Sequence, residues 1–358
     1  MIILIIALLI SSFFAFNIGA SGASATMGAV YGSGVIKRKR VALILSGAGC
    51  FLGALLGGEV VTTIGKGLIP EGMMSIHIAM IILFTSAFTL YFTNMIGIPL
   101  STSEVTVGSI IGVGLAIQKV YFFNLLEIVT FWILVPFVSF FVVFLFVRFT
   151  NWVRRKYPVK ASSKTVKVLG LLLVVTGFIE AFAAGMNNVA NAVGPLVGAG
   201  VIDTNIGLIV GGVFVALGSI FLGGRVLETN GKKISQLNLL DGIAVSGTTG
   251  ILVITSSLFG IPIPMVQVTT SGIVGVGAAK NWHGTRRNKT IYQIIKVWIT
   301  SPIVSLVFAF ILTDIFINSS FYNAAIIVGG ILATLIITNF GRGAVLKKPL
   351  KEEINYDN

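Results

Sequence analysis

The chain has 358 residues, of which 55% are hydrophobic and only 10% are charged, and its mean hydropathy is +0.99. A soluble globular protein carries roughly 25% charged residues, and disulfide scaffolds, disordered chains and coiled coils lack recurrent bilayer-length apolar stretches, so these classes are excluded. The net charge of +13 lies in short Lys and Arg clusters between apolar segments, which is typical of cytoplasmic loops and not of a nucleic-acid-binding surface. The composition therefore predicts an all-α polytopic protein that lies in a lipid bilayer.

Apolar segments follow one another along the whole chain, and we expect about eleven membrane crossings, with a range of ten to twelve. The first and sixth segments exceed the roughly 20 residues that one straight span needs, and both are rich in Gly, Asn and Ser, so we expect broken helices there. Residues 1–16 lack the basic start of a signal peptide and are counted in the first span. The segments are 1–35, 41–64, 74–96, 98–118, 121–147, 166–202, 205–224, 240–259, 261–279, 291–313 and 321–341.

The positions of the basic residues predict the orientation. With one crossing per segment and the N-terminus outside, 23 of the 25 Lys and Arg residues fall on the cytoplasmic side, and only Lys66 and Lys119 lie outside. Cytoplasmic loops carry the excess of positive charge, so we expect the N-terminus outside and the C-terminus inside the cytoplasmic membrane of the cell. A re-entrant hairpin would not change this count.

The two halves of the sequence resemble each other at a nearly constant spacing. The paired stretches begin at Gly19 and Gly185, at Gly57 and Gly223, at Gly97 and Gly260, and at Trp132 and Trp298, with offsets of 166, 166, 163 and 166. Each half holds five predicted crossings, an odd number, so the second copy is expected to be inverted relative to the first. Inverted repeats with broken helices at the midplane are typical of secondary transporters.

The duplication defines the expected organisation of the chain. We expect a first repeat, a basic cytoplasmic linker, an inverted second repeat, an additional transmembrane helix and a cytoplasmic tail. Their ranges are 1–150, 151–165, 166–316, 317–341 and 342–358.

Small and amide side chains interrupt the first motif of each half. The first copy carries Ser21 and Ser24, and the second carries Asn187, Asn188 and Asn191. For a single Ser, close packing between helices is a sufficient explanation. Buried amides need polar partners, so the Asn cluster is expected to line a cavity near the middle of the membrane.

The third motif of each half places hydroxyl groups after proline. Ser101, Thr102 and Ser103 follow Pro99, and the second copy begins at Gly260. Proline near the start of a helix fits its missing N–H, so the motif predicts a half-helix whose free N–H groups and hydroxyls bind an anion. The alternative is a helix cap with hydroxyls bonded back to the backbone.

Acidic residues inside apolar spans are candidates for proton coupling. Glu104 adjoins the hydroxyl group of three, and Glu180 precedes the Asn cluster. One cysteine, Cys50, and two distant histidines exclude a disulfide within the chain and give no metal site, and no cofactor is expected. The sequence contains no nucleophile–base set or phosphate-binding loop, so we do not expect an enzyme.

These motifs resemble the inorganic phosphate transporter (PiT) family over almost the whole chain. Its duplicated signature, roughly Gly-Ala-Asn-Asp-Val-Ala-Asn, is similar to Gly185-Met-Asn-Asn-Val-Ala-Asn191, and its Gly-Leu-Pro-Val-Ser-Thr-Thr-His element is similar to Gly97-Ile-Pro-Leu-Ser-Thr-Ser-Glu104. The resemblance implies an inverted-repeat transporter whose Ser101, Thr102 and Ser103 contact the substrate.

The departures from the family pattern bear on the substrate. Positions that the family associates with sodium are Gly22 and Ala25 in the first copy and Asn188 and Asn191 in the second, so the carboxylate ligands that a hard cation prefers are missing. The stretches around these positions resemble the sulfate permease branch of the family. Sulfate carries no proton at pH 7, and this suits a site that offers only donors.

The sequence is therefore interpreted as a proton-coupled sulfate importer, with thiosulfate or phosphate as further possible substrates. Protons and the lipid bilayer are its expected partners, and a homodimer is possible. The alternatives are a phosphate symporter driven by Na⁺ or H⁺, an anion channel, and a membrane subunit without transport. The predicted anion site comprises Ser21, Ser24, Ser101, Thr102, Ser103, Asn187, Asn188 and Asn191.

Overall fold

The computed structural model describes residues 1–70, 72–96, 100–157, 162–228, 237–282, 285, 289–321 and 328. The chain separates into two compact units, Met1–Phe310 and Ile311–Asn358. The first unit contains the features discussed below. The described part of the second unit is the end of the last helix and the residues that follow it.

The secondary structure of the described residues is helical. The elements are α1 (Ile2–Ile18), the π-helix η1 (Gly19–Ala23), α2 (Gly28–Gly32), α3 (Lys39–Ala54), α4 (Gly58–Lys66), α5 (Ile76–Ile96), α6 (Thr102–Ala116), α7 (Phe122–Lys156), α8 (Ser163–Gly198), α9 (Thr204–Leu222), α10 (Gly224–Glu228), α11 (Leu239–Leu258), α12 (Met265–Lys280) and α14 (Lys289–Phe316).

Within the described residues, seven helical stretches are long and apolar enough to cross a membrane, and the bent pair α3–α4 makes an eighth. α3 and α4 meet at 68°, across the break that holds Gly57. Two expected crossings, 98–118 and 261–279, contain the short helices α6 and α12 instead of full spans. The expected segment 321–341 lies almost wholly outside the described residues. A count of eleven therefore stays a prediction.

The two overlong segments behave differently. The first breaks as expected, at a turn formed by Thr26 and Met27, which separates the short helix α2 from the continuous span of α1 and the π-helix η1. π-helical turns of this kind often occur at functional sites. The sixth does not break: α8 runs without interruption for 36 residues. Its extra length lies at its N-terminal end, where Lys164 and Lys167 are exposed, so the expectation of a break there is wrong.

Both proline motifs open a short helix, as expected. α6 begins at Thr102 with Ser101 as its N-cap, and α12 begins at Met265 with Pro264 as its N-cap. Neither N-cap residue makes a side-chain cap bond. Pro99 itself lies outside the described residues. The first N–H groups of both half-helices therefore lack a capping side chain, as at an anion-binding helix end.

Glycines let pairs of helices approach within backbone contact. A Cβ placed on Gly185 of α8 would lie 1.9 Å from the carbonyl oxygen of Cys50 in α3. At the corresponding position of the first half, a Cβ on Gly19 would lie 1.9 Å from the carbonyl oxygen of Val215 in α9. The partners in these two contacts differ by 166 and 165 positions, close to the spacing of the sequence repeat.

The half-helices pack across the halves in the same paired way. Gly112 of α6 lies against the backbone of Leu306 in α14, and Gly275 of α12 lies against the backbone of Phe140 in α7. These positions are again 163 and 166 residues apart. The short helix of each half therefore packs on the long helix that ends the other half.

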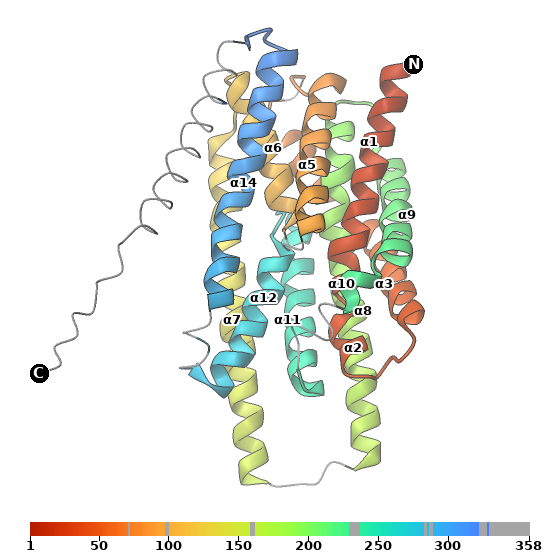
Figure 1. Ribbon diagram of the computed structural model, residues 1–358, viewed down its shortest axis with the longest axis vertical. Coiled ribbons are helices and arrows are strands. Elements are labelled where there is room, and N and C mark those ends of the chain that lie inside the picture. Colours follow the sequence, from red (N-terminus) through yellow and green to blue (C-terminus); the bar gives the residue numbers. More distant parts are fainter. Residues whose placement is uncertain are drawn as a thin grey trace, which may run out of the picture. The chain divides into compact units, whose positions relative to one another are not determined.

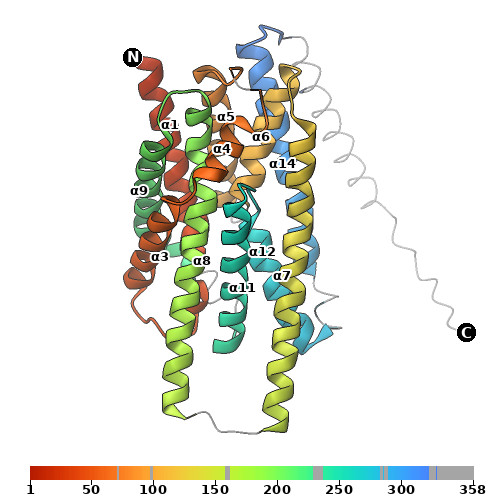
Figure 2. The ribbon, with the colours of Figure 1, turned by 180° about the vertical axis from the view of Figure 1, so that it is seen from behind.

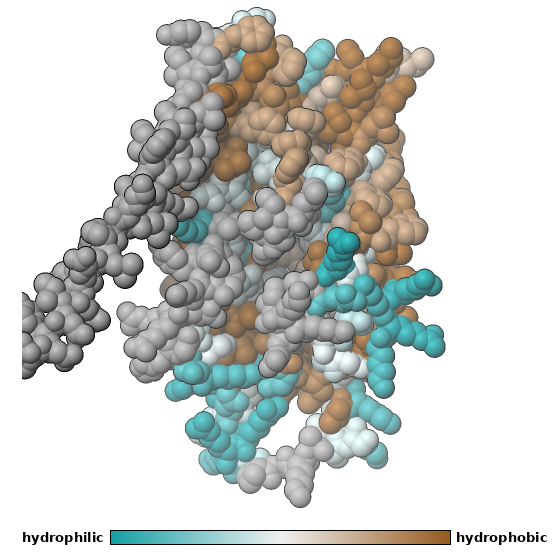
Figure 3. All heavy atoms as spheres, viewed as in Figure 1, coloured by the Kyte–Doolittle hydropathy of each residue, from teal (hydrophilic) through white to brown (hydrophobic). Residues whose placement is uncertain are grey.

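The arrangement places α8 between α3 and α9 on one side and α11 on the other, with α12 and α7 beyond α11 (Figure 1; Figure 2). α7 ends and α8 begins at the lower end of Figure 1, opposite the N-terminus. Hydrophilic residues gather at this lower end, whereas hydrophobic residues cover the upper part (Figure 3).

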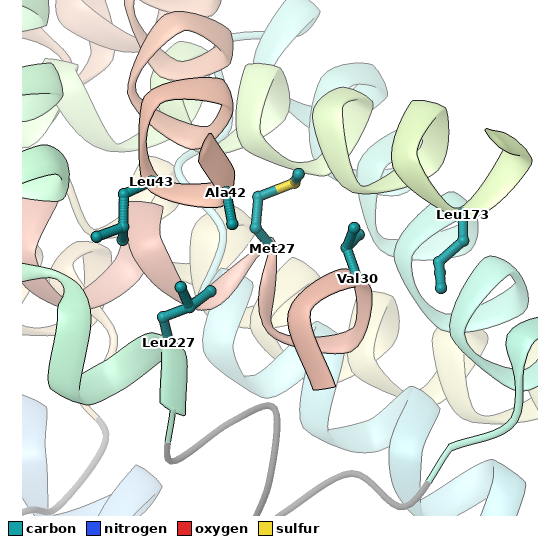
Figure 4. Close-up of a cluster of buried hydrophobic side chains, with 6 residues drawn as sticks. All are labelled: Met27, Val30, Ala42, Leu43, Leu173 and Leu227. Carbon is teal, nitrogen blue, oxygen red and sulfur yellow. The ribbon is translucent and has the colours of Figure 1, made fainter. Parts of the chain in front are cut away.

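An apolar cluster closes the space where α2, α3, α8 and α10 meet (Figure 4). Beside it, Lys39 of α3 forms an ion pair with Glu228 of α10, with 2.9 Å between Nζ and Oε1. Both of these side chains are partly exposed, so this pair contributes little to stability. The cluster consists of Met27, Val30, Ala42, Leu43, Leu173 and Leu227.

Candidate functional site

Three chain segments from distant parts of the sequence meet in one buried polar cluster. They are the N-terminus of α6, the C-terminal half of α8 and the extended residues that precede α12. The cluster, here called the amide cluster, is completely or almost completely inaccessible to solvent. Its members are Thr102, Ser103, Asn187, Asn188, Asn191 and the backbone of Ile263.

Asn187 holds the segment before α12. Its Nδ2 donates to the carbonyl oxygen of Ile263 at 2.9 Å, and its Oδ1 accepts from the Ile263 N–H at 3.1 Å. On the other side of this segment, Trp132 of α7 donates its Nε1–H to the Pro262 carbonyl oxygen at 2.9 Å. Both polar groups of the extended backbone at Ile263 are therefore satisfied inside the protein, as a buried irregular segment requires.

Thr102 and Ser103 connect α6 to the amides of α8. The Thr102 hydroxyl donates to Asn188 Oδ1 at 2.7 Å, and Asn187 Nδ2 donates to Ser103 Oγ at 3.2 Å. Asn191 Nδ2 reaches Ser103 Oγ at 3.3 Å. The hydroxyls therefore point across to α8 and do not cap their own helix, which decides against the back-bonded alternative at these two positions.

The amide cluster retains hydrogen-bonding capacity that the described residues leave unused. Asn191 Oδ1 is buried and has no partner. The partner of Asn188 Nδ2 among the described residues is the thioether sulfur of Met265, at 3.9 Å, which is a weak acceptor. An unpartnered buried amide is costly, and such atoms in a native site indicate a missing partner. Rotation of the Asn191 amide by 180° would let Ser103 donate to its oxygen and would leave a free N–H in place of the free oxygen.

The first half of the sequence approaches the amide cluster through a glycine. A Cβ on Gly22 of η1 would lie 3.7 Å from Asn188 Nδ2. Ser21 donates to the Asn17 carbonyl oxygen at 2.9 Å and is partly exposed. Ser24 donates to the Ala20 carbonyl oxygen and lies against Gly223, so the structure does not bring it to the amide cluster.

Glu104 lies one residue beyond Ser103, but its carboxylate belongs to a separate group. One oxygen accepts from Gln267 of α12, and the other accepts from Ser301 of α14 at 3.1 Å. Glu104 and Gln267 are the third residues of the two half-helices and differ by 163 positions. The carboxylate therefore ties the N-termini of α6 and α12 to each other and lies where two partially positive helix ends face it.

Glu180 forms a second buried acidic group on α8. Thr269 of α12 donates to its Oε1 at 3.0 Å, and Ser246 of α11 also donates to the carboxylate. Glu180 precedes Asn187 by seven residues, so both lie on one face of α8, about 10 Å apart along its axis. The described part of the chain thus places one carboxylate at the half-helix ends and one on the α8 face below the amides.

Sequence reasoning found the side chains of α6 and α8 but missed four partners: Ile263, Met265, Ser246 and Ser301. Ile263 acts through its backbone, which no motif reveals. Ser246 and Ser301 are isolated serines in apolar helices, and such residues usually serve close packing. The only available signal was the repeat, which pairs Gln267 with Glu104 and so directed attention to this part of α12.

Comparison with known proteins finds relatives over almost the whole chain. A family model described as the phosphate transporter family matches residues 18–309. The sulfate permease CysP of Bacillus subtilis (strain 168) is 49% identical over 349 residues, which cover 97% of this chain and 96% of that protein.

A solved structure, described as the sodium-dependent phosphate transporter, has the same fold, with a TM-score of 0.75. It is 23% identical in sequence, and the match covers 87% of this chain and 98% of that one.

Proposed function

Because the chain belongs to the phosphate transporter family, we propose that it is a secondary active transporter that imports sulfate across the cytoplasmic membrane. The observation that carries this proposal is the amide cluster: a buried group of neutral amides and hydroxyls with unused hydrogen-bonding capacity, placed at the N-terminus of a half-helix. The named sulfate permease among the relatives supports this substrate.

The chemistry of the amide cluster favours a dianion over a cation. The two nearest carboxylates, Glu104 and Glu180, are each bound by two donors outside the cluster. At Gly22 the first half presents no side chain at all, and the nearest atom of Asn188 is its amide nitrogen. Neutral donors and helix N–H groups bind sulfate without a full positive charge, and they release it more readily than a lysine or arginine would.

We assign the anion site to Thr102, Ser103, Asn188 and Asn191, with Ser101 at the helix start and Ser21 beside Gly22. Asn187 positions the segment before α12, because both ends of its amide are taken up by Ile263. Ser24 is left out of this assignment because it lies against Gly223.

The coupling ion in this proposal is the proton, and the carrier is one of the two buried carboxylates. Proton coupling does not require the sodium ligands that the sequence lacks, and an intramembrane carboxylate is the usual proton relay of a transporter. The two halves are proposed to form inverted five-crossing repeats with the N-terminus outside. The paired glycine contacts of α3 with α8 and of η1 with α9 support this symmetry.

Phosphate is the second candidate substrate, and one observation favours it. Asn191 Oδ1 is a buried acceptor without a partner among the described residues, and phosphate species that carry a proton could donate to it whereas sulfate could not. The family description and the structural relative point to the same anion.

The test is uptake of labelled sulfate into proteoliposomes under an inward proton gradient and, separately, under a sodium gradient. Unlabelled thiosulfate and phosphate are added as competitors. Proton-driven uptake that phosphate fails to inhibit is the expected result. Sodium-driven uptake that phosphate inhibits would replace this proposal by phosphate symport, and downhill flux without accumulation would indicate an anion channel.

A further inference from the structure

Thr269 has two hydrogen-bond acceptors within reach and one proton to donate. Its Oγ1 lies 3.0 Å from Glu180 Oε1 and 3.1 Å from the carbonyl oxygen of Met265, one turn earlier in α12. A hydroxyl can donate only one hydrogen bond at a time, so the two acceptors compete for it. Thr270, the next residue, reaches one acceptor within the described part of the chain, the carbonyl oxygen of Val266, at 2.7 Å.

The charge of Glu180 determines whether the Thr269 hydroxyl donates to Glu180 or to the Met265 carbonyl oxygen. An ionised carboxylate is the stronger acceptor, so Thr269 then donates to Glu180. Once Glu180 has bound a proton, its own O–H can donate to Thr269 Oγ1, and the Thr269 hydroxyl turns to the Met265 carbonyl. The covalent change in this step is the O–H bond that forms when the Glu180 carboxylate takes up a proton, and the other changes are exchanges of hydrogen bonds.

The Met265 end of this switch lies beside the proposed anion site. Met265 is the first residue of α12, and its sulfur contacts Asn188 Nδ2. The preceding Ile263 is held by Asn187. Bonds from a threonine hydroxyl to the carbonyl four residues earlier bend helices slightly, so making or releasing this bond moves the first turn of α12 against the amides.

The side chains around Glu180 determine whether it is ionised or protonated. α11 presents Ser246, α12 presents Thr269, and α3 presents Cys50, whose thiol donates to the Ala181 carbonyl oxygen at 3.0 Å. The acid on α6, Glu104, is bound by Gln267 and Ser301. Among the described residues, hydrogen bonds and burial, without a charged partner, define the electrostatic environment of Glu180.

Glu104 has no comparable switch. Each of its oxygens has its own donor, and within the described part of the chain neither Gln267 nor Ser301 has a second acceptor between which to choose. Its geometry suits a fixed link between the half-helices.

We propose that Thr269 is a positioning residue for proton coupling, which transmits the protonation of Glu180 to the anion site by switching its hydroxyl between Glu180 and the Met265 carbonyl. The inference rests on the proposed function and specifies which carboxylate carries the proton and how the anion site responds to it.

The test compares Thr269→Val, Thr269→Ser and Thr270→Val in proteoliposomes. Two readouts are taken: proton-driven sulfate uptake as a function of pH, and exchange of labelled for unlabelled sulfate at equal pH on both sides. Valine has the shape of threonine without the hydroxyl, and Thr270→Val is the matched control because its hydroxyl contacts only its own helix.

In Thr269→Val we expect driven uptake to fall about tenfold or more, since a charge-assisted hydrogen bond is lost. The pH of half-maximal uptake should rise by about one unit, because the ionised carboxylate loses more than the protonated one. Exchange should stay within about threefold of the wild type. Thr269→Ser should restore the pH profile, and Thr270→Val should not change it.

An unchanged pH profile in Thr269→Val, with proton-driven wild-type uptake, would overturn this inference and leave the proposed function standing. Equal losses of driven uptake and exchange without a shift of the profile would reduce Thr269 to a structural residue and also overturn it. Wild-type uptake that does not depend on the proton gradient would overturn both the proposed proton coupling and this inference.

Discussion

Replacing Thr102 by valine removes the hydrogen bond that joins α6 to α8 at the amide cluster. The hydroxyl donates to Asn188 Oδ1 at 2.7 Å and lies 3.5 Å from Asn191 Nδ2. Valine keeps the shape of the side chain, and Asn188 Oδ1 retains its bond from Asn187 at 3.1 Å, so the fold should survive.

The expected loss of affinity is the difference between two hydrogen bonds. A hydrogen bond to a charged ligand contributes about 2 kcal/mol, and a buried hydrogen bond within the protein contributes about 1 kcal/mol. Because the Thr102 hydroxyl has one proton, sulfate replaces Asn188 as its acceptor, so valine should cost about 1 kcal/mol, or roughly fivefold in sulfate affinity.

The assay is sulfate uptake into proteoliposomes as a function of sulfate concentration, with the amount of reconstituted protein measured in parallel. Thr130→Val serves as the control, because Thr130 is exposed on α7 and donates only to the Leu126 carbonyl oxygen of its own helix. An apparent affinity within twofold of the wild type in Thr102→Val would refute the assignment of this hydroxyl to the anion site.

Three further predictions concern the packing of the helices and segments around the amide cluster. Asn187→Ala leaves the N–H and C=O of Ile263 without partners, so the protein should lose about 3 kcal/mol of stability and melt at a lower temperature in detergent, as fluorescence-detected size exclusion would show. Gly185→Ala places a methyl group within 1.9 Å of the Cys50 carbonyl oxygen and should abolish monodisperse protein. In the control variant Gly58→Ala the added methyl group meets no atom within 4 Å, so this variant should be tolerated. Equal yields of the two variants would contradict the close packing of α3 and α8. The buried thiol of Cys50 should resist maleimide in the folded protein and react with it in denaturant, as mass spectrometry of the labelled protein would show. Rapid labelling of the native protein would contradict the burial of this thiol.

The sequence predicted the parts of the fold that depend on composition and local signals. Apolar length located the long helices, and proline motifs located the starts of α6 and α12. The repeat spacing was matched by glycine contacts such as those of Gly19 and Gly185. These features follow from bilayer thickness, proline geometry and small-residue packing, all of which are local properties of the chain.

Length and composition alone could not locate the helix breaks. The Gly- and Asn-rich C-terminal half of α8 stays helical, and its amides find partners on α6 and before α12. Those partners come from distant parts of the chain. The similar stretch after Gly19 adopts a π-helix instead. Whether a polar stretch in a membrane helix unwinds depends on the groups that face it, and a single sequence does not contain that information.

The candidate site could be predicted only in part, because its contacts also depend on groups from distant parts of the chain. Thr102, Ser103 and the amides could be named because polar residues stand out in apolar segments, and the structure brings them together. Ser24 could not be separated from them by sequence, since its contact with Gly223 depends on how η1 faces α9 and α10.

The central claim is that sulfate binds at the amide cluster between α6, α8 and the segment before α12. The most direct measurement is an experimental structure of the protein with selenate, a sulfate isostere whose selenium gives an anomalous signal. We predict an anomalous peak within hydrogen-bonding distance of Thr102, Ser103 and Asn188. A peak elsewhere in the protein, with this cluster empty at saturating selenate, would contradict the claim.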